Sequence, residues 1–366
     1  MQKDAMSHLI LLLLIPAVMG GLAHLLLNAS ITKKEYLLLV GIGSTAAVGG
    51  FFLARWGALQ DTELWNGRIT EKLHGSEGCC HCRQVCATCT DSKGQSYSCR
   101  CHTVCDHSHD LYWALAVNTG DRLTIESCEP PWASAPNAWT NAYVGEPAAV
   151  PHGYTNYLLA DPDSLLRQEG GADGERAAGV PPYPNGYGFY KVNRFVQFAG
   201  APTNPEVAAK WRAALDELNA DLGAKLQVNI VALATTTNDW TVAKAVEAAW
   251  IYGKKNDLIF VLGVPDGKTI AWAEVVTISR VEALRLATRE KLRGLPIDAV
   301  RTLDGVLRGL VADHWHRTPM SEFEYLASAA SPSGPWLVAL YSLVLLLTAG
   351  LIAWGHHEDV FQERYR

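Results

Sequence analysis

The amino-acid sequence predicts a mixed α/β protein with three membrane spans, a cysteine-rich β module and an α/β domain. Three observations predict this fold class. Three long runs are almost free of charge, eight of the nine cysteines lie between residues 79 and 105, and residues 204–328 alternate helical and strand patterns. A net charge of −6 offers no basic surface for nucleic acid, which we therefore exclude as a partner.

The apolar runs are Leu9–Leu27, Tyr36–Ala54 and Trp336–Trp354. A transmembrane helix needs about 20 apolar residues, and Tyr and Trp favour its ends. The first two runs predict a transmembrane hairpin over residues 1–56, with spans at 9–27 and 36–54. The third predicts a C-terminal span at 336–354, followed by a tail at 355–366. The first run could instead be a cleaved signal peptide.

Three spans place residues 57–335 on one side of the bilayer and the loop 28–35 and the tail on the other. The loop carries Lys33 and Lys34, and the tail carries Arg364 and Arg366. Because short cytoplasmic flanks are enriched in Lys and Arg, the loop and tail are predicted to be cytoplasmic. The middle region is then extracytoplasmic or periplasmic, where disulfides persist.

Residues 57–130 are predicted to form a Cys/His-rich module beside a β-hairpin of strands Leu111–Val117 and Arg122–Ile125. Small cysteine-rich segments are held by disulfides or by structural zinc, and the sequence leaves both open. The cysteines concerned are Cys79, Cys80, Cys82, Cys86, Cys89, Cys99, Cys101 and Cys105. Four histidines could add metal ligands, namely His81, His102, His107 and His109, and Cys128 could be an extra disulfide partner.

Residues 131–203 are rich in Pro, Gly and Tyr and predict an extended strap whose aromatic side chains, including Trp132 and Trp139, dock on a neighbouring surface.

The α/β domain is predicted over residues 204–328. Its predicted elements, in order, are helix Glu206–Leu222, strand Leu226–Ala234, helix Trp240–Tyr252, strand Asp257–Val264, strand Thr269–Ile278 and helices Val281–Arg293 and Val300–Trp315. This order predicts helices on both faces of a mixed sheet.

Within this domain, the strand Val228-Asn-Ile-Val-Ala-Leu233 precedes a helix that ends Ala249-Trp-Ile-Tyr-Gly253, and a polar turn leads into Leu258-Ile-Phe-Val-Leu262. In this pattern the region 204–326 resembles the TPM (TPM phosphatase-like) domain family. The resemblance implies a membrane-tethered α/β/α sandwich. It also implies either a metal-dependent phosphatase-like activity with a divalent cation or a role in assembling membrane complexes. Residues Thr62–Leu166 lie outside the family and resemble uncharacterised bacteriophage-encoded membrane proteins.

The TPM pattern often has paired acidic residues where this chain has Ile270-Ala-Trp-Ala-Glu-Val-Val276. Asp257 is therefore the one residue that we name as a catalytic candidate. The alternative is that Asp257 only forms the turn before its strand. We therefore expect a membrane-anchored structural or assembly protein that binds protein partners or self-associates, rather than an enzyme. The alternatives are a TPM-type metal-dependent hydrolase and an envelope-remodelling protein that oligomerises through its spans.

Overall fold

The computed structural model describes residues 2–26, 33–160, 179–184, 186–187, 190–198, 200, 204–250, 254–279 and 281–358. They divide into two compact units. The first unit comprises residues 1–62, 153–169 and 319–366, and the second comprises 63–152 and 170–318. The cysteine-rich module and the α/β domain, which the sequence treats as separate segments, thus belong to one unit.

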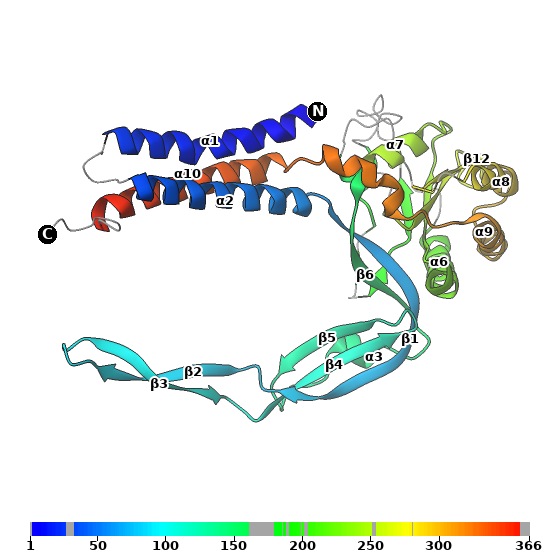
Figure 1. Ribbon diagram of the computed structural model, residues 1–366. Coiled ribbons are helices and arrows are strands. Elements are labelled where there is room, and N and C mark those ends of the chain that lie inside the picture. The colour runs from blue at the N-terminus through cyan, green and yellow to red at the C-terminus, as the bar shows by residue number, and fades with distance from the viewer. Residues whose placement is uncertain are drawn as a thin grey trace. The chain divides into compact units, whose positions relative to one another are not determined.

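The first unit contains three helices long and apolar enough to cross a membrane (Figure 1). They are α1 (Gln2–Leu26), α2 (Lys33–Gly57) and α10 (Gly334–Glu358). Leu12, Phe51 and Leu340 meet in a small core between them. The three apolar helices predicted from the sequence are thereby confirmed, whereas most of the loop 28–35 and the end of the tail lie outside the described residues. Two 3-10 helices, η1 (Tyr157–Leu159) and η3 (Met320–Ala329), complete this unit.

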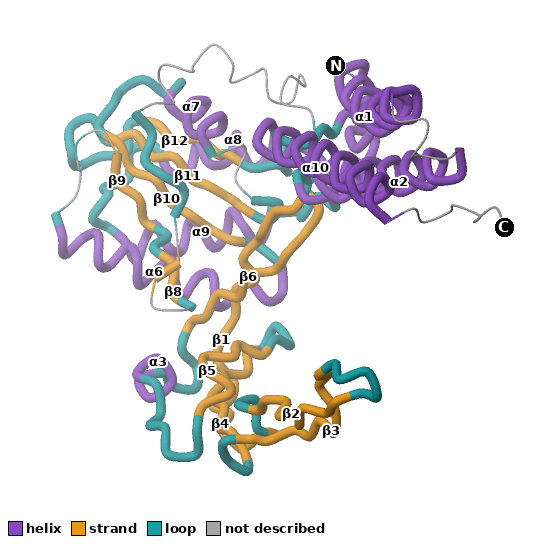
Figure 2. Tube along the Cα trace, turned by 90° about the vertical axis from the view of Figure 1, so that its left-hand side faces the viewer, coloured by secondary structure: helices purple, strands orange, loops and turns teal. Residues whose placement is uncertain are grey.

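A four-stranded antiparallel sheet begins the second unit, in the order β5-β4-β1-β6 (Figure 2). Its strands are β1 (Gln60–Gly78), β4 (His109–Val117), β5 (Arg122–Glu129) and β6 (Pro147–Thr155). Alternate residues, among them Ile69, Leu115 and Val150, form the core of this sheet. The predicted hairpin of residues 111–125 is present as β4 and β5, and β1 adds a long strand that was not among the predicted elements.

Between β1 and β4 the chain forms a second antiparallel hairpin, β2 (Cys82–Thr90) and β3 (Ser96–Cys105). We call residues 82–105 the arm; it is drawn in cyan in Figure 1. At its turn, the Asp91 side chain accepts hydrogen bonds from the N–H groups of Lys93 and Gln95, both at 2.8 Å. The cysteine-rich segment is therefore itself a hairpin, rather than a cluster packed beside one.

The α/β domain has the sheet order β12-β11-β10-β9, in which β9, β10 and β11 are parallel and β12 is antiparallel to β11. Asn204 caps the first helix through a 2.8 Å hydrogen bond to the Val207 N–H, and Pro205 occupies the first turn. The strands are β9 (Phe195–Phe198), β10 (Asn229–Thr235), β11 (Asp257–Gly263) and β12 (Trp272–Val276). The helices are α6 (Pro205–Leu226), α7 (Val242–Ala249), α8 (Glu282–Leu292) and α9 (Val300–His314).

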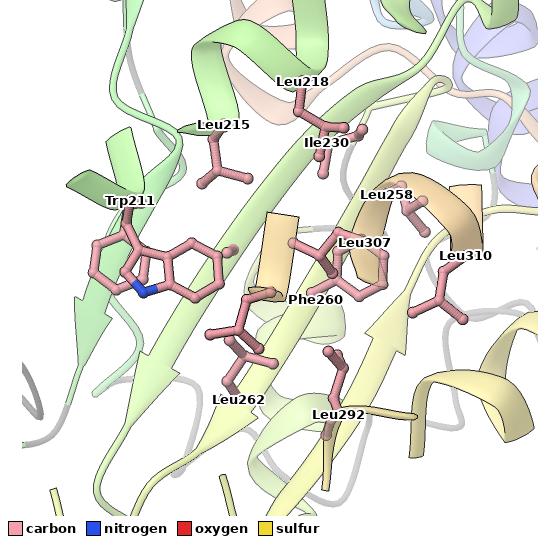
Figure 3. Packing of buried hydrophobic residues seen from close by; sticks show 14 of the residues in the cluster. Trp211, Leu215, Leu218, Ile230, Leu258, Phe260, Leu262, Leu292, Leu307 and Leu310 are labelled. Carbon is pink, nitrogen blue, oxygen red and sulfur yellow. The ribbon is translucent and has the colours of Figure 1, made fainter. Parts of the chain in front are cut away.

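Helices cover both faces of this sheet, as the order of elements predicted. On one face, side chains of α6, α8 and α9 pack against Ile230, Leu258 and Phe260 (Figure 3). On the other face, Val246 and Trp250, at and just after α7, pack against β10 and β11. Every residue of β10 and β11 is buried, which explains why both read as continuous apolar runs.

The predicted strap, 131–203, is only partly extended. It contains the short helix α3 (Asn137–Asn141), strands β6 and β9 of the two sheets, and the two-residue strands β7 (Gly186–Tyr187) and β8 (Lys191–Val192). Trp139 docks as expected and donates a hydrogen bond to the Leu73 or Ala114 carbonyl, both at 3.1 Å. Trp132, in contrast, is 77% exposed.

Candidate functional site

Three disulfides join the two strands of the arm as rungs. They pair Cys82 with Cys105, Cys86 with Cys101 and Cys89 with Cys99. Every residue of β2 and β3 is exposed or half-buried, so neither strand gains stability from a hydrophobic core. An isolated hairpin is at best marginally stable in water, and cross-links compensate by restricting its unfolded state. The prediction of a disulfide-bonded, cysteine-rich segment is confirmed.

A fourth disulfide, Cys80–Cys128, ties the segment just before the arm to β5. The arm joins the four-stranded sheet through two short links, residues 79–81 after β1 and 106–108 after β3. The Asp106 N–H donates a 3.0 Å hydrogen bond to the His81 carbonyl and so connects the two links. These links are the two main-chain connections between the arm and the sheet.

Four potential metal ligands gather at these links, and one ligand atom of each lies within 4.8 Å of the others. We call them the hinge cluster: Cys79, His81, His107 and Asp110. Cys79, on the first link, is the free thiol among the nine cysteines, all of which lie in the described part of the chain. The imidazole of His107, on the second link, is 10% exposed, and the Asp110 carboxylate, on β4, is fully buried.

Asp110 is the electrostatic centre of the hinge cluster. Its carboxylate accepts hydrogen bonds from the Cys80 N–H and from a ring nitrogen of His107, and His81 Nδ1 lies 3.3 Å from each of its oxygens. Burial alone would raise the pKa of Asp110, but these hydrogen bonds outweigh it and lower the pKa to about 2. The carboxylate is therefore ionised at neutral pH and available as an anionic ligand.

The other predicted ligands are distributed differently. Six of the eight cysteines named as disulfide or zinc residues, Cys82, Cys86, Cys89, Cys99, Cys101 and Cys105, are bonded in rungs of the arm. His102 and His109 lie on β3 and β4 and are not members of the hinge cluster. Sequence reasoning missed Asp110; the signal was an acidic residue three positions after His107, beside the thiols.

Asp257, the weak catalytic candidate, is 0% exposed. It accepts hydrogen bonds from the Tyr183 hydroxyl at 2.7 Å, from Asn229 at 2.8 Å and from the Lys254 N–H at 2.7 Å. Burial raises the pKa of Asp257 to about 6, against the lowering effect of these bonds. Because the carboxylate is saturated with protein donors and sealed from solvent, its geometry fits the structural alternative.

The Asp257 network continues to the four-stranded sheet. The Asn229 side-chain oxygen accepts a hydrogen bond from Asn66 Nδ2 on β1 at 3.0 Å, and Asn66 Oδ1 accepts one from Arg194 at 2.6 Å. Asn66 Nδ2 also donates a hydrogen bond to Asn219 Oδ1 on α6, at 3.1 Å. These side chains are buried and hydrogen-bonded to one another, so they join the two sheets of the second unit through polar contacts.

A cleft of about 460 Å³ is lined by β12, by α8 and the residues that follow it, and by the segment that follows β10. Its lining includes Asn238, Trp240, Trp272, Glu274, Arg289 and Arg293. Among the described lining residues Glu274 is the one carboxylate, and Arg289 binds both of its oxygens, at 2.7 and 3.0 Å. A divalent cation is usually held by several free oxygen ligands, so this cleft offers little for the cation that the resemblance implies.

Comparison of the chain with protein-family models, with curated proteins and with solved structures yields no match.

Proposed function

We propose that this chain is a membrane-anchored assembly protein that uses the arm to bind a protein partner or a second copy of itself. The observation that carries the proposal is the structure of the arm. None of its 24 residues is buried, yet three disulfide rungs hold its two strands together. These cross-links add little to the stability of the hydrophobic core of the unit. They do hold an extended surface in one conformation, which lowers the conformational entropy lost on binding.

The arm also offers a surface that proteins can recognise. Among the described strands β2 and β3 pair only with each other, so each has an outer edge with backbone groups that a partner strand could meet. Side chains add to this surface. Tyr97 is 54% exposed and Val85 is 39% exposed. Aromatic side chains are enriched where interfaces contribute most to binding.

The three apolar helices support the membrane anchor, and the disulfides support an extracytoplasmic position for the second unit. A TPM-type sandwich in the α/β domain is part of the proposal. Helices on both faces of its sheet are consistent with that family, some of whose members are linked to assembly or repair of membrane complexes. The hydrolase alternative has less support because Asp257 is sealed and Glu274 is paired.

The test removes the arm and asks whether a complex is lost. Residues 82–105 are replaced by Asn-Gly, a dipeptide that suits a tight hairpin turn, and Arg301→Ala on the exposed side of α9 is the matched control. Native electrophoresis of detergent-extracted membranes should show a complex for the wild type and the control, but only the free protein for the arm-less variant. A photo-crosslinking residue at position 97 should form an adduct to a protein, and one at position 301 should not.

Retention of the complex by the arm-less variant would contradict the proposal. So would cation-stimulated hydrolysis of a phosphomonoester by the wild type that is lost in Glu274→Gln, since this result would establish the hydrolase alternative. A crosslinked species containing two differently tagged copies of the chain would identify the partner as a second copy.

A further inference from the structure

The hinge cluster combines donors from both links and from the sheet. Cys79 and His81 belong to the first link, His107 to the second, and Asp110 to β4. One ligand bound by all of them would therefore fix the arm to the sheet at both of its attachment points.

We propose that the hinge cluster binds a zinc ion that clamps the base of the arm. One thiolate, two neutral imidazoles and one carboxylate together carry two negative charges and so balance Zn²⁺. All are ligand types that zinc takes in tetrahedral sites, where bond lengths near 2.0–2.3 Å place ligand atoms about 3.3–3.8 Å apart. The four ligand atoms lie within 4.8 Å of one another, so one ion could reach all of them after adjustment of the side chains.

Two independent features point to a ligand here. The first is His107 Nδ1, which is buried and lacks a hydrogen-bond partner among the described residues. A buried polar atom left unpaired costs free energy, and a metal bound through Nδ1 would remove that cost. His107 cannot readily turn outward because its ring packs on Trp132 at 5.6 Å and on His81 at 5.1 Å.

The second feature is the chemistry of Cys79. Its Sγ lies within 4.8 Å of both sulfurs of the Cys82–Cys105 rung. A free thiolate at that distance could attack Cys82, release Cys105 as the new thiolate and so break the first rung. Coordination by zinc would occupy the Cys79 lone pair and prevent this exchange. The other two groups of nearby ligand types contain cysteines that are already bonded to each other, so the hinge cluster is the one of the three groups found among the described residues whose cysteine is a free thiol.

Four protein ligands leave no open position on a tetrahedral ion, so this zinc is structural. It adds to the proposed function by setting the direction of the arm, yet it does not depend on the arm having a partner. A negative result in the arm-deletion test would contradict the proposed function, whereas a negative result in the metal test would contradict only the zinc site.

The test uses the full chain, extracted in detergent without reductant, freed of metal by a chelator and then titrated with Zn²⁺. We expect one Zn²⁺ per chain. Cys79→Ser and His107→Ala should each weaken binding by more than about 100-fold, because loss of even an outer-shell partner costs 10- to 100-fold. His102→Ala, which changes an exposed histidine of the arm outside the hinge cluster, should bind as the wild type does. With Co²⁺, a thiolate charge-transfer band should appear and be absent in Cys79→Ser.

Alkylation of the wild-type protein keeps the test decisive if a variant misfolds. Zn²⁺ should slow modification of Cys79 by iodoacetamide at least tenfold. The proposal fails if Cys79 reacts equally fast with and without Zn²⁺, if His102→Ala lowers the zinc content as much as His107→Ala does, or if mass spectrometry finds Cys79 in a disulfide in the purified chain.

Discussion

At the scale of the residue, Asp257 illustrates how burial changes a carboxylate. Its pKa of about 6 in the folded chain exceeds the ordinary value of 3.8. Between these pH values the folded state holds more protons than the unfolded state, so the free energy of unfolding falls as the pH rises. The decrease is complete above about pH 6 and amounts to about 3 kcal/mol if the unfolded chain has the ordinary pKa.

This pH dependence is a prediction for Asp257→Asn. In the wild type the Asp257 carboxylate lowers the free energy of unfolding as the pH rises from about 4 to 6. The variant, which has no carboxylate at this position, should not show this contribution. Denaturant titrations of the detergent-solubilised chain, followed by tryptophan fluorescence, measure it as the difference between wild type and variant at each pH. Parallel stability curves for the two proteins would show that Asp257 is not buried as described.

A second residue-scale prediction concerns Gly223 on α6, where a Cβ would lie 2.4 Å from Asn66 Cβ and 2.7 Å from the Asn66 carbonyl oxygen. Gly223→Ala should destabilise the second unit by about 1–3 kcal/mol, since the clash with β1 outweighs the gain in helix propensity. Gly305→Ala on α9 is the matched control. A Cβ there meets nothing within 4 Å, so the change should stabilise by up to about 1 kcal/mol. Equal stabilisation by both changes would contradict the contact between α6 and β1.

At the scale of the element, the rungs should determine how often the arm opens. Removing the central rung with Cys86→Ala and Cys101→Ala frees a loop with a sequence separation of 15, which is worth about 3 kcal/mol. We expect trypsin to cleave the arm at Lys93 or Arg100 about 10- to 100-fold faster.

The control for this experiment is Thr88→Ala with Ser98→Ala, which changes a facing pair on the same strands and keeps every rung. Its cleavage rate should stay near that of the wild type. Equal rates for the double-cysteine variant and the wild type would show that the remaining rungs suffice.

At the scale of the whole molecule, the predicted topology has both the loop 28–35 and the C-terminal tail in the cytoplasm. A fluorescent protein that folds only in the cytoplasm should therefore fluoresce when fused after Arg366. A phosphatase that folds only outside it should be active when fused after Thr62, past the second apolar helix. The reverse pattern would place the disulfide-bonded arm in a reducing compartment and would contradict the extracytoplasmic position.

Local patterns predicted the elements whose signal lies within a few residues of sequence. The α9 helix runs from Val300 to His314, close to the predicted range of Val300–Trp315. Strand β11 begins at Asp257, as predicted, because both of its faces are covered and its apolar run is unbroken. Strand β9 was not predicted, since its four residues become a strand only by pairing with β10.

Hydrophobic periodicity and composition were enough to predict the three apolar helices, the need for cross-links in the cysteine-rich segment, and helices on both faces of the α/β sheet. These features are encoded locally in the sequence. The pairing of the cysteines, the burial of Asp257 and the approach of Asp110 to His107 and Cys79 emerged from the folded structure alone. They depend on contacts between residues far apart in the chain, as when the pairing of β1 with β4 places Glu77 opposite Asp110.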